Sequence, residues 1–288
     1  MSLFDEPDDI GAPLPEMVAQ HIRQLPPLPA AVLYLYQLRS EAQLDMATLA
    51  GKMALEPTLL AKTLLLANMA SHSQTNAVAN VEEAVQVLGF YMLRTLALGG
   101  AVRERFAHIE GGDIDADAFW RHAIATSALC RILAERAGYD GTHAFAAGML
   151  HDIGCLVLAS AYPRHYAAAR AFARRENVPG IEVERRTLGV DHACAGSAIA
   201  CQWHFPILVQ EAIAFHHHPE HAAAFSLAPL VHLADALAHV LQGSVKEEAL
   251  AKRLHPQIWQ LAGVNEDDCD AILSQGRQAV RAILSAVD

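Results

Sequence analysis

Apolar residues recur at helical spacing along most of this chain, and this pattern restricts the fold to one built from helices. The stretch that follows Pro57 shows it clearly, because one face carries Leu59, Leu60, Thr63, Leu64 and Ala67. Hydrophobic residues, mostly Ala and Leu, make up 53% of the chain, whereas aromatic residues make up only 6%. Ala and straight-chain residues lose little rotamer freedom in a helix, so this composition favours an all-α fold over a β-sandwich.

Prolines and helix-capping residues divide the pattern into separate helices. Asp45 and Asp191 are suited to the N-cap position, and Gly89 is suited to the end of a helix. We therefore expect helices over residues 30–39, 46–55, 57–70, 81–88, 91–106, 118–138, 142–160, 162–177, 192–203, 206–216, 229–241, 246–254, 256–262 and 266–286.

One segment without apolar periodicity, HIEGGDIDAD at residues 108–117, predicts a domain boundary. The N-terminus, MSLFDEPDDIGAPLPE, is acidic and proline-rich, unlike a signal or transit peptide. The predicted organisation is a disordered tail, an N-terminal helical subdomain, a second helical domain packed against it, and a C-terminal helical extension. Their expected ranges are residues 1–19, 20–112, 113–242 and 243–288.

Charge and hydropathy limit the partners that the chain can have. The net charge is −11, and a nucleic-acid surface needs Lys and Arg side chains for phosphate contacts, so we expect no nucleic-acid partner. No uncharged apolar run reaches the roughly 18 residues that a membrane span needs. We therefore expect a cytoplasmic protein without a membrane span, and the sequence does not determine its oligomeric state.

The cysteines are predicted to be reduced and buried. Their number is odd, no two are spaced as CxxC, and most lie in apolar helical stretches: Cys130, Cys155, Cys194, Cys201 and Cys269. Buried thiols in a cytosolic protein explain this pattern better than disulfides or a zinc site.

Histidine is the unusual residue type, with 16 among 288 residues. Seven His and Asp residues follow one another on, or at the ends of, separate predicted helices: His122, His151, Asp152, His192, His216, His217 and Asp235. Imidazole and carboxylate groups are ligands of Zn, Mn and Fe, and helix bundles build metal sites from several helices. Adjacent helical residues point about 100° apart, so the His151–Asp152 pair can serve one site only where helices converge.

This ordered series resembles the HD superfamily of metal-dependent phosphohydrolases. The wider pattern is similar to the HDOD family, the HD-related output domain of bacterial signalling proteins. That resemblance covers about residues 20–240 and rests on LPPLP, EPTLLAKTLLLANMA, NVEEAVQVLG, FWRHA, AAGMLHDIG, GVDHACAG, CQWHFP and AIAFHHHP, in this order. It implies an HD-like bundle at residues 113–242 and, if a metal is bound, Fe, Mn or Zn.

Two departures from the related cyclic di-GMP phosphodiesterases bear on activity. Those enzymes follow HDIG with Lys, whereas this chain has Cys155. They also continue the histidine pair with a Gly-Tyr-Pro loop, whereas His217 is followed here by His218, Pro219 and Glu220. HDOD proteins in general are regarded as regulatory modules without demonstrated catalysis.

The resemblance therefore implies, first, a bacterial signal-transduction output or regulatory module without catalysis. It would bind signalling proteins, such as a sensor kinase, a receiver or a cyclase-type protein, or a nucleotide second messenger. The second hypothesis is a metal-dependent phosphohydrolase in which the seven residues hold metal and Asp152 lies next to the attacking hydroxide. A third is a metal site that only stabilises the bundle.

Simpler roles remain open for the same residues. His151 and Asp152 can form a buried, hydrogen-bonded pair, and Asp235 can be a polar partner of a neighbouring helix. Three successive helical residues span about 200°, so the three histidines at 216–218 cannot all face one site, and His218 is the one expected at a helix end.

Several other polar and aromatic residues are assigned structural roles. We expect Trp120 and Trp203 to be core residues and Asn68 to hold a neighbouring loop. Five arginines are predicted to lie on solvated helix faces, with the last two also able to contact an acidic partner: Arg131, Arg136, Arg170, Arg174 and Arg175.

Overall fold

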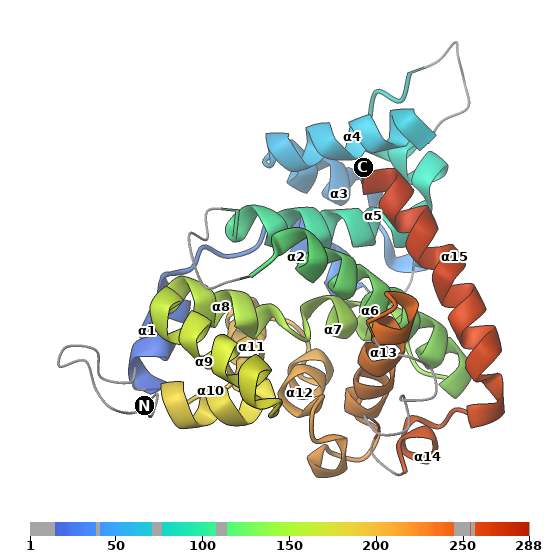
Figure 1. The fold of residues 1–288 in the computed structure, drawn as a ribbon. Helices are drawn as coiled ribbons and strands as arrows, with labels where there is room; N and C mark the ends of the chain where they lie inside the picture. Colours follow the sequence, from blue (N-terminus) through green and yellow to red (C-terminus); the bar gives the residue numbers. More distant parts are fainter. Residues whose placement is uncertain are drawn as a thin grey trace.

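The computed structural model describes residues 15–38, 41–70, 77–107, 114–244, 254 and 257–287, and within them the regular elements are helices (Figure 1). The all-α prediction is confirmed. The N-terminal part comprises α1 (Pro15–Gln24), α2 (Ala30–Gln37), α3 (Met46–Ala54), α4 (Pro57–Ala70) and α5 (Val81–Arg105). The bundle comprises α6 (Ala116–Ala137), α7 (Gly141–Leu150), α8 (Ile153–Ala161), α9 (Pro163–Glu176), α10 (Gly180–Leu188), α11 (His192–Gln202), α12 (Ile207–Phe215) and α13 (Ala228–Leu241). The C-terminal helices are α14 (Ile258–Ala262) and α15 (Cys269–Val287).

The capping residues act as expected. The Asp45 carboxylate accepts hydrogen bonds from the first amides of α3, and Asp191 accepts one from the amide of Cys194 in α11. Gly89 has φ +76° and bends α5, so the two helices predicted on either side of it join directly. At this φ a side chain would be strained, which explains why glycine occupies the bend.

Some parts of the predicted organisation differ from the structure or lie outside the described residues. Helix α1 begins at Pro15, so residues 15–19 are helical and do not belong to a tail. Helix α10 was not predicted, because its charged sequence GIEVERRTL hides a narrow buried face. Residues 1–14, most of the boundary segment 108–117 and most of the predicted helix 246–254 lie outside the described part.

The single helix predicted over residues 142–160 is wrong. The chain forms α7 and α8 instead, and His151 and Asp152 make the turn between them. Asp152 has φ −99° and ψ 8°, and its carbonyl accepts a hydrogen bond from the Cys155 amide at 2.8 Å. The turn lets α7 pack against α6 while α8 packs against α11. A continuous apolar run concealed this change of direction.

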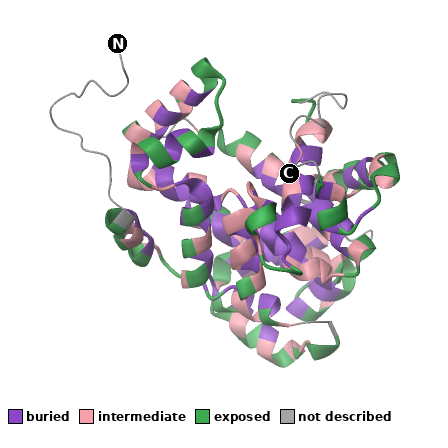
Figure 2. Ribbon diagram, turned by 90° about the horizontal axis from the view of Figure 1, so that it is seen from below, coloured by how far each residue is buried: buried purple, intermediate pink, exposed green. Residues whose placement is uncertain are grey.

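The N-terminal helices and the bundle share one hydrophobic core. It extends from Val18 in α1 to Ile283 in α15, and buried residues fill the centre of the molecule (Figure 2). Arg94 of α5 is buried, and its guanidinium donates to Thr142 Oγ1 at 2.7 Å and to the Leu38 carbonyl at 2.6 Å. Helix α15 contacts both α6 and α4, so the C-terminal part also joins the two regions (Figure 1).

Trp120, Trp203 and Asn68 have the structural roles predicted for them. Trp120 and Trp203 are buried, and the Trp203 indole donates to the Pro26 carbonyl at 3.2 Å. Asn68 bonds both the amide and the carbonyl of Val78, which holds the chain after α4 against that helix.

The prediction of uniformly buried cysteines is wrong, although the thiols are free. Cys130 is buried, but Cys194 and Cys201 are exposed, because they lie on the outer face of α11. Two helical stretches, 81–105 and 141–161, are long and apolar enough to cross a membrane. Their most apolar windows are 56% and 78% buried within the fold, as in core helices.

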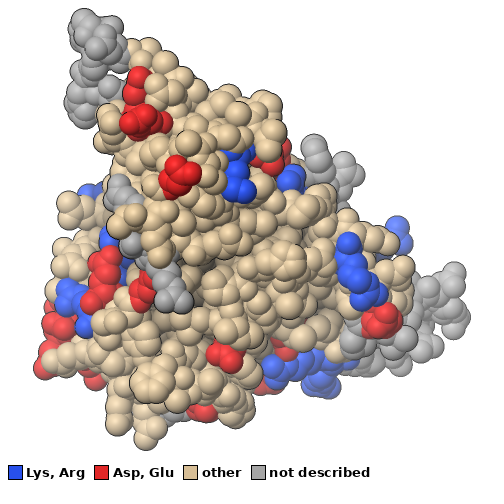
Figure 3. Space-filling model, turned by 180° about the vertical axis from the view of Figure 1, so that it is seen from behind, with Lys and Arg blue, Asp and Glu red and all other residues tan. Residues whose placement is uncertain are grey.

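Surface charge is dispersed on the face opposite to the view of Figure 1. Lys and Arg side chains there lie in small separate groups, most of them near acidic side chains (Figure 3). They form no continuous basic surface on the described part of that face, in keeping with the net charge of −11.

A close backbone contact at Gly154 fixes α8 against α11. A Cβ atom at Gly154 would lie 1.9 Å from the His192 carbonyl oxygen and 2.7 Å from the Gly196 amide nitrogen. The contact also sets the separation between Asp152 and His192, because Asp152 lies two residues before Gly154 and His192 supplies the carbonyl at the contact.

Gly154→Ala is expected to destabilise the protein by at least about 3 kcal/mol, because the methyl group meets backbone atoms that cannot rotate away. The melting temperature should fall by roughly 6–10 °C in thermal unfolding followed by circular dichroism. Gly51→Ala is the control, because a Cβ there has nothing within 4 Å and the site lies inside α3. This substitution should stabilise the protein by about 0.5–1 kcal/mol, because alanine is favoured over glycine inside a helix. Equal melting temperatures for the two variants would contradict the packing argument.

Candidate metal centre

The seven predicted His and Asp residues converge on one place in the bundle. His122 comes from α6, His151 and Asp152 from the α7–α8 turn, His192 from the start of α11, and Asp235 from α13. His216 and His217 follow directly on α12. These residues form overlapping groups whose potential ligand atoms lie within 4.8 Å of one another.

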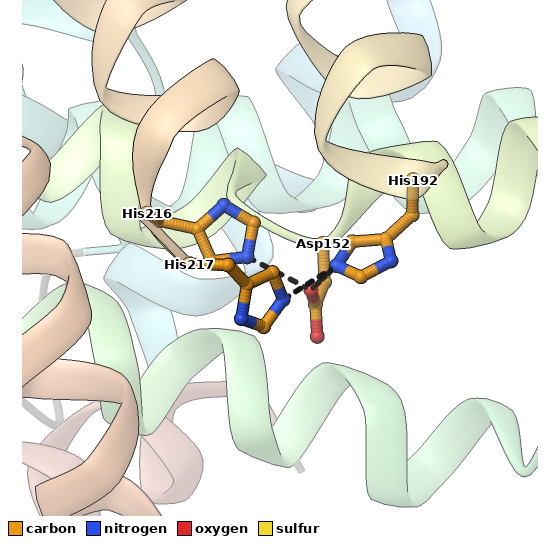
Figure 4. Close-up of side chains that lie close together, drawn as sticks. All are labelled: Asp152, His192, His216 and His217. Atoms are coloured by element: carbon orange, nitrogen blue, oxygen red, sulfur yellow. Dashed lines mark hydrogen bonds and ion pairs between the residues drawn. The ribbon is translucent and has the colours of Figure 1, made fainter. Parts of the chain in front are cut away.

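One group surrounds Oδ1 of Asp152 (Figure 4). Nε2 of His192 lies 3.4 Å from this oxygen and Nε2 of His216 lies 3.7 Å from it. Nε2 of His217 lies 2.9 Å from Nε2 of His192. Three imidazole nitrogens and one carboxylate oxygen therefore face a common centre, which is the donor set of a four-coordinate metal ion.

A second group surrounds the other carboxylate oxygen. Nε2 of His151 lies 3.3 Å from Oδ2 of Asp152 and 4.0 Å from Oδ1 of Asp235. Nε2 of His122 lies 2.9 Å from the same Asp235 oxygen. Asp152 thus offers one oxygen to each group, an arrangement that can bridge two ions.

The histidine rings are held in the orientation that metal ligands need. Nδ1 of His151 donates to the Gly148 carbonyl at 2.8 Å, and Nδ1 of His216 donates to the Ile213 carbonyl at 2.7 Å. In the neutral form with Nδ1 protonated, each ring carries its lone pair on Nε2. Both Nε2 atoms are buried: that of His151 faces the Asp152 carboxylate at 3.3 Å, whereas that of His216 has no hydrogen-bond partner. A metal ion would satisfy the orphaned Nε2 of His216, so the residues present fit such a group.

Two further residues belong to the site and were not predicted. Oε2 of Glu184, on the unpredicted helix α10, accepts from Nδ1 of His192 at 2.6 Å and from its amide at 2.8 Å. His239 places Nε2 3.5 Å from Asp235 Oδ1, one helical turn along α13. The spacing between Asp235 and His239 was a signal that could have been used. No such signal marked Glu184, which stands in a charged helix.

Other residues near the site have different surroundings. His218 points to Glu220, with 3.5 Å between Nδ1 and Oε1, so it is the histidine of the run that does not join the groups. Cys155, which stands where the related phosphodiesterases have Lys, lies against Glu184 and His192.

Charge interactions explain the protonation of the histidines. Burial lowers the pKa of His151, but the Asp152 and Asp235 carboxylates outweigh it and raise the pKa to about 9. Burial also lowers the pKa of His192, but the Glu184 and Asp152 carboxylates outweigh it and raise this pKa to about 9. At His217 burial and the neighbouring histidines act together and lower the pKa to about 2. The 2.9 Å contact between the Nε2 atoms of His192 and His217 therefore joins a ring whose pKa is raised to a ring whose pKa is lowered.

The carboxylates are held ionised. Burial raises the pKa of Asp152, yet His151, His216 and His192 outweigh it and hold that pKa well below its usual range. The pKa of Asp235 is lowered in the same way, against burial, by His122, His151 and His239. In metal-free protein the neighbouring carboxylates thus favour the protonated forms of His151 and His192, and a divalent ion could replace those protons.

Comparison with solved structures supports the fold. A protein from Shewanella amazonensis SB2B, provisionally named a phosphohydrolase, is 27% identical with a TM-score of 0.71, covering 93% of this chain and 98% of that chain. An HDOD domain protein of unknown function from Geobacter sulfurreducens is 21% identical with a TM-score of 0.74, covering 95% and 98%. A protein from Marinobacter aquaeolei VT8, provisionally named a signal transduction protein, is 23% identical with a TM-score of 0.72, covering 94% and 64%.

Sequence comparison identifies the family. An uncharacterized protein from Treponema pallidum (strain Nichols) is 26% identical over 208 residues, which are 71% of this chain. The match spans only 40% of that relative's length. The family profile of the HDOD domain matches residues 25–219, a segment that includes six of the seven predicted site residues. This chain belongs to the HDOD family.

Proposed function

We propose that this chain is a metal-dependent phosphohydrolase of the HD type. The observation that carries the proposal is the convergence of imidazoles whose Nδ1 atoms are already hydrogen-bonded and whose Nε2 atoms face Asp152. A buried Nε2 atom without a partner, as at His216, is costly unless something binds there. These observations make the phosphohydrolase our first hypothesis and the regulatory module our second, which reverses the order that the family resemblance implied.

The donor set indicates the class of metal. Asp152, His192, His216 and His217 would hold one ion. His122, His151 and Asp152 would hold the other, together with Asp235, which lies 2.9 Å from His122 and 4.0 Å from His151. Mixed nitrogen and oxygen donors suit Fe, Mn or Zn better than Ca or Mg. The proposal thus takes a divalent ion of this kind as the cofactor, without selecting one of the three.

The chain's own residues would position a substrate and its water. When bound, such an ion supplies Lewis acidity and lowers the pKa of a water molecule to about 7, which suits phosphoester hydrolysis. Asp152 lies between the two donor groups, where it would orient the attacking water. Glu184 fixes the ring of His192 through Nδ1, so that its Nε2 stays directed at the centre.

A regulatory output module remains the second candidate, favoured by HDOD family membership and by Cys155 after HDIG. It would act in a bacterial cytoplasm by binding signalling proteins of the sensor kinase, receiver or cyclase type, or a nucleotide second messenger. The name of the M. aquaeolei structure suggests signalling for that protein. In this case the metal would stabilise the bundle and perform no chemistry.

Untagged protein reconstituted with Mn²⁺, Fe²⁺ or Zn²⁺ is expected to hydrolyse p-nitrophenyl phosphate or bis(p-nitrophenyl) phosphate. Asp152→Asn keeps the side-chain volume but removes the shared charge, so activity should fall at least about 100-fold. His221→Ala is the control and should keep wild-type activity. His221 is exposed, and its Nε2 lies 3.8 Å from Glu220, which belongs to neither donor group.

Elemental analysis of the same samples separates the candidates. Protein that retains metal but hydrolyses neither ester, and whose melting temperature falls on chelation, supports the regulatory module with a structural metal. Protein that binds none of the three metals would refute the phosphohydrolase.

Glu184→Gln should weaken divalent metal binding about 10- to 100-fold, because His192 loses the carboxylate that orients its ring and strengthens its Nε2 as a ligand. Titration with Mn²⁺ followed by calorimetry measures this affinity. Glu182→Gln changes an exposed carboxylate on the same helix and should leave the affinity unchanged. Equal affinities for wild type and Glu184→Gln would remove Glu184 from the site.

A further inference from the structure

An apolar pocket lies where the N-terminal helices meet the bundle, and it shares no lining residue with the seven His and Asp residues of the candidate metal centre. Its volume is about 460 Å³, and its lining comes from α4, α5, α6, α7 and α15. These helices meet there because α5 packs on α4 and contacts α7, while α15 contacts both α4 and α6. Pockets of about 300–1,000 Å³ hold small molecules, so this one is large enough for a ligand.

The lining of the pocket is largely hydrophobic. Buried side chains form much of it, among them Leu96 of α5 and Ile283 of α15. Thr63 and Thr95 supply its buried polar groups, and the Thr95 hydroxyl donates to the Tyr91 carbonyl at 3.1 Å. An apolar molecule that left water for this lining would therefore gain from the hydrophobic effect.

Two successive glycines of α5 keep space open in the pocket. Apart from the backbone of its own helix, a Cβ atom at Gly99 would have only Met149 Cε within 4 Å, at 3.9 Å, and one at Gly100 would have nothing. Alanine would fit at both positions, and inside a helix it is more stable than glycine by about 0.5–1 kcal/mol. Packing within the described residues does not require these glycines, whereas an occupant of the pocket would.

The charged residues of the described lining are exposed and already paired. Lys62 Nζ lies 4.0 Å from Glu104 Oε2, and Arg103 Nη2 lies 3.5 Å from Asp117 Oδ1. Each cation thus faces a carboxylate, so the pocket offers no free counter-ion to a charged ligand. Moving an unpaired charge into apolar surroundings is costly, and this lining therefore favours an uncharged molecule.

Two of the lining helices also carry residues of the candidate metal centre. On α6, Trp120 and Ile124 line the pocket, and His122 stands midway between them. Helical residues two positions apart point about 200° apart, so α6 turns one face to the pocket and the opposite face to the metal centre. On α7, Met149 lines the pocket two residues before His151. A ligand that shifted either helix would move a donor atom.

We propose that the pocket binds an uncharged, apolar small molecule, and that its occupancy changes the affinity of the metal centre for its ion. Through α6 and α7 the presence of the ligand would reach His122 and His151. Such coupling is reciprocal, so the metal would change the affinity for the ligand by the same factor. Binding to the pocket does not depend on the proposed function, whereas the coupling rests on it, since it requires a bound metal.

Fluorescence titration with N-phenyl-1-naphthylamine, an uncharged apolar dye, tests the pocket. Gly99→Leu places a side chain in the pocket and should weaken dye binding at least about tenfold. Gly51→Leu is the matched control and should bind like wild type, because Gly51 is exposed on α3 and a Cβ there has nothing within 4 Å. Thermal unfolding shows whether each variant is folded. If Gly99→Leu does not fold, the smaller Gly99→Val decides.

The dye titrations can overturn either part of the binding proposal. No binding to wild type, or equal affinity for wild type and the folded Gly99 variant, would refute the pocket as a ligand site. As competitors, 1-decanol should displace the dye at least about tenfold better than decanoate, whose charge opposes burial. Equal displacement by the two would refute an uncharged ligand.

Calorimetric titration with Mn²⁺, with and without saturating dye, tests the coupling. The dye should change the Mn²⁺ affinity of wild type at least about fivefold, and Gly99→Leu should lose this change. An unchanged Mn²⁺ affinity with dye bound would overturn the coupling and leave the pocket standing. Wild-type protein that binds none of Mn²⁺, Fe²⁺ and Zn²⁺ would refute the proposed function and the coupling with it, while the dye titrations would still judge the pocket.

Discussion

The contact between Gly154 and the backbone of α11 is the constraint on which the site depends. Because no side chain separates the two helices, the His192 carbonyl approaches α8 directly, and the α7–α8 turn lies beside the start of α11. His151 and Asp152 can then face the same centre although they are adjacent in sequence. A straight helix over this segment would direct one of the two away from the other ligands.

Much of the fold and of the site could be predicted, because their signals are local or ordered along the chain. Asp45 and Asp191 marked helix starts through their capping side chains. The order of the His and Asp residues predicted which seven side chains converge in the bundle, since each stands in a recognisable short motif. The all-α prediction followed from the helical spacing of apolar residues together with composition.

What could not be predicted depends on tertiary contacts. The turn at His151–Asp152 lies in a continuous apolar run, and only packing against α6 and α11 shows why the chain bends there. Glu184 stands in a charged helix where such residues are usually solvated. It gains its role from His192, which follows eight residues later but lies on the next helix, α11.

The hydrogen bonds from the Nδ1 atoms divide the histidines into two kinds. Those of His151 and His216 end on main-chain carbonyls, which no substitution of a neighbouring side chain can delete. That of His192 ends on a side chain, Glu184, which a single mutation can change. The orientation of His151 and His216 is therefore insensitive to substitutions around them. The orientation of His192 can be changed through residue 184, so relatives with the same fold could differ in metal affinity while keeping every ligand.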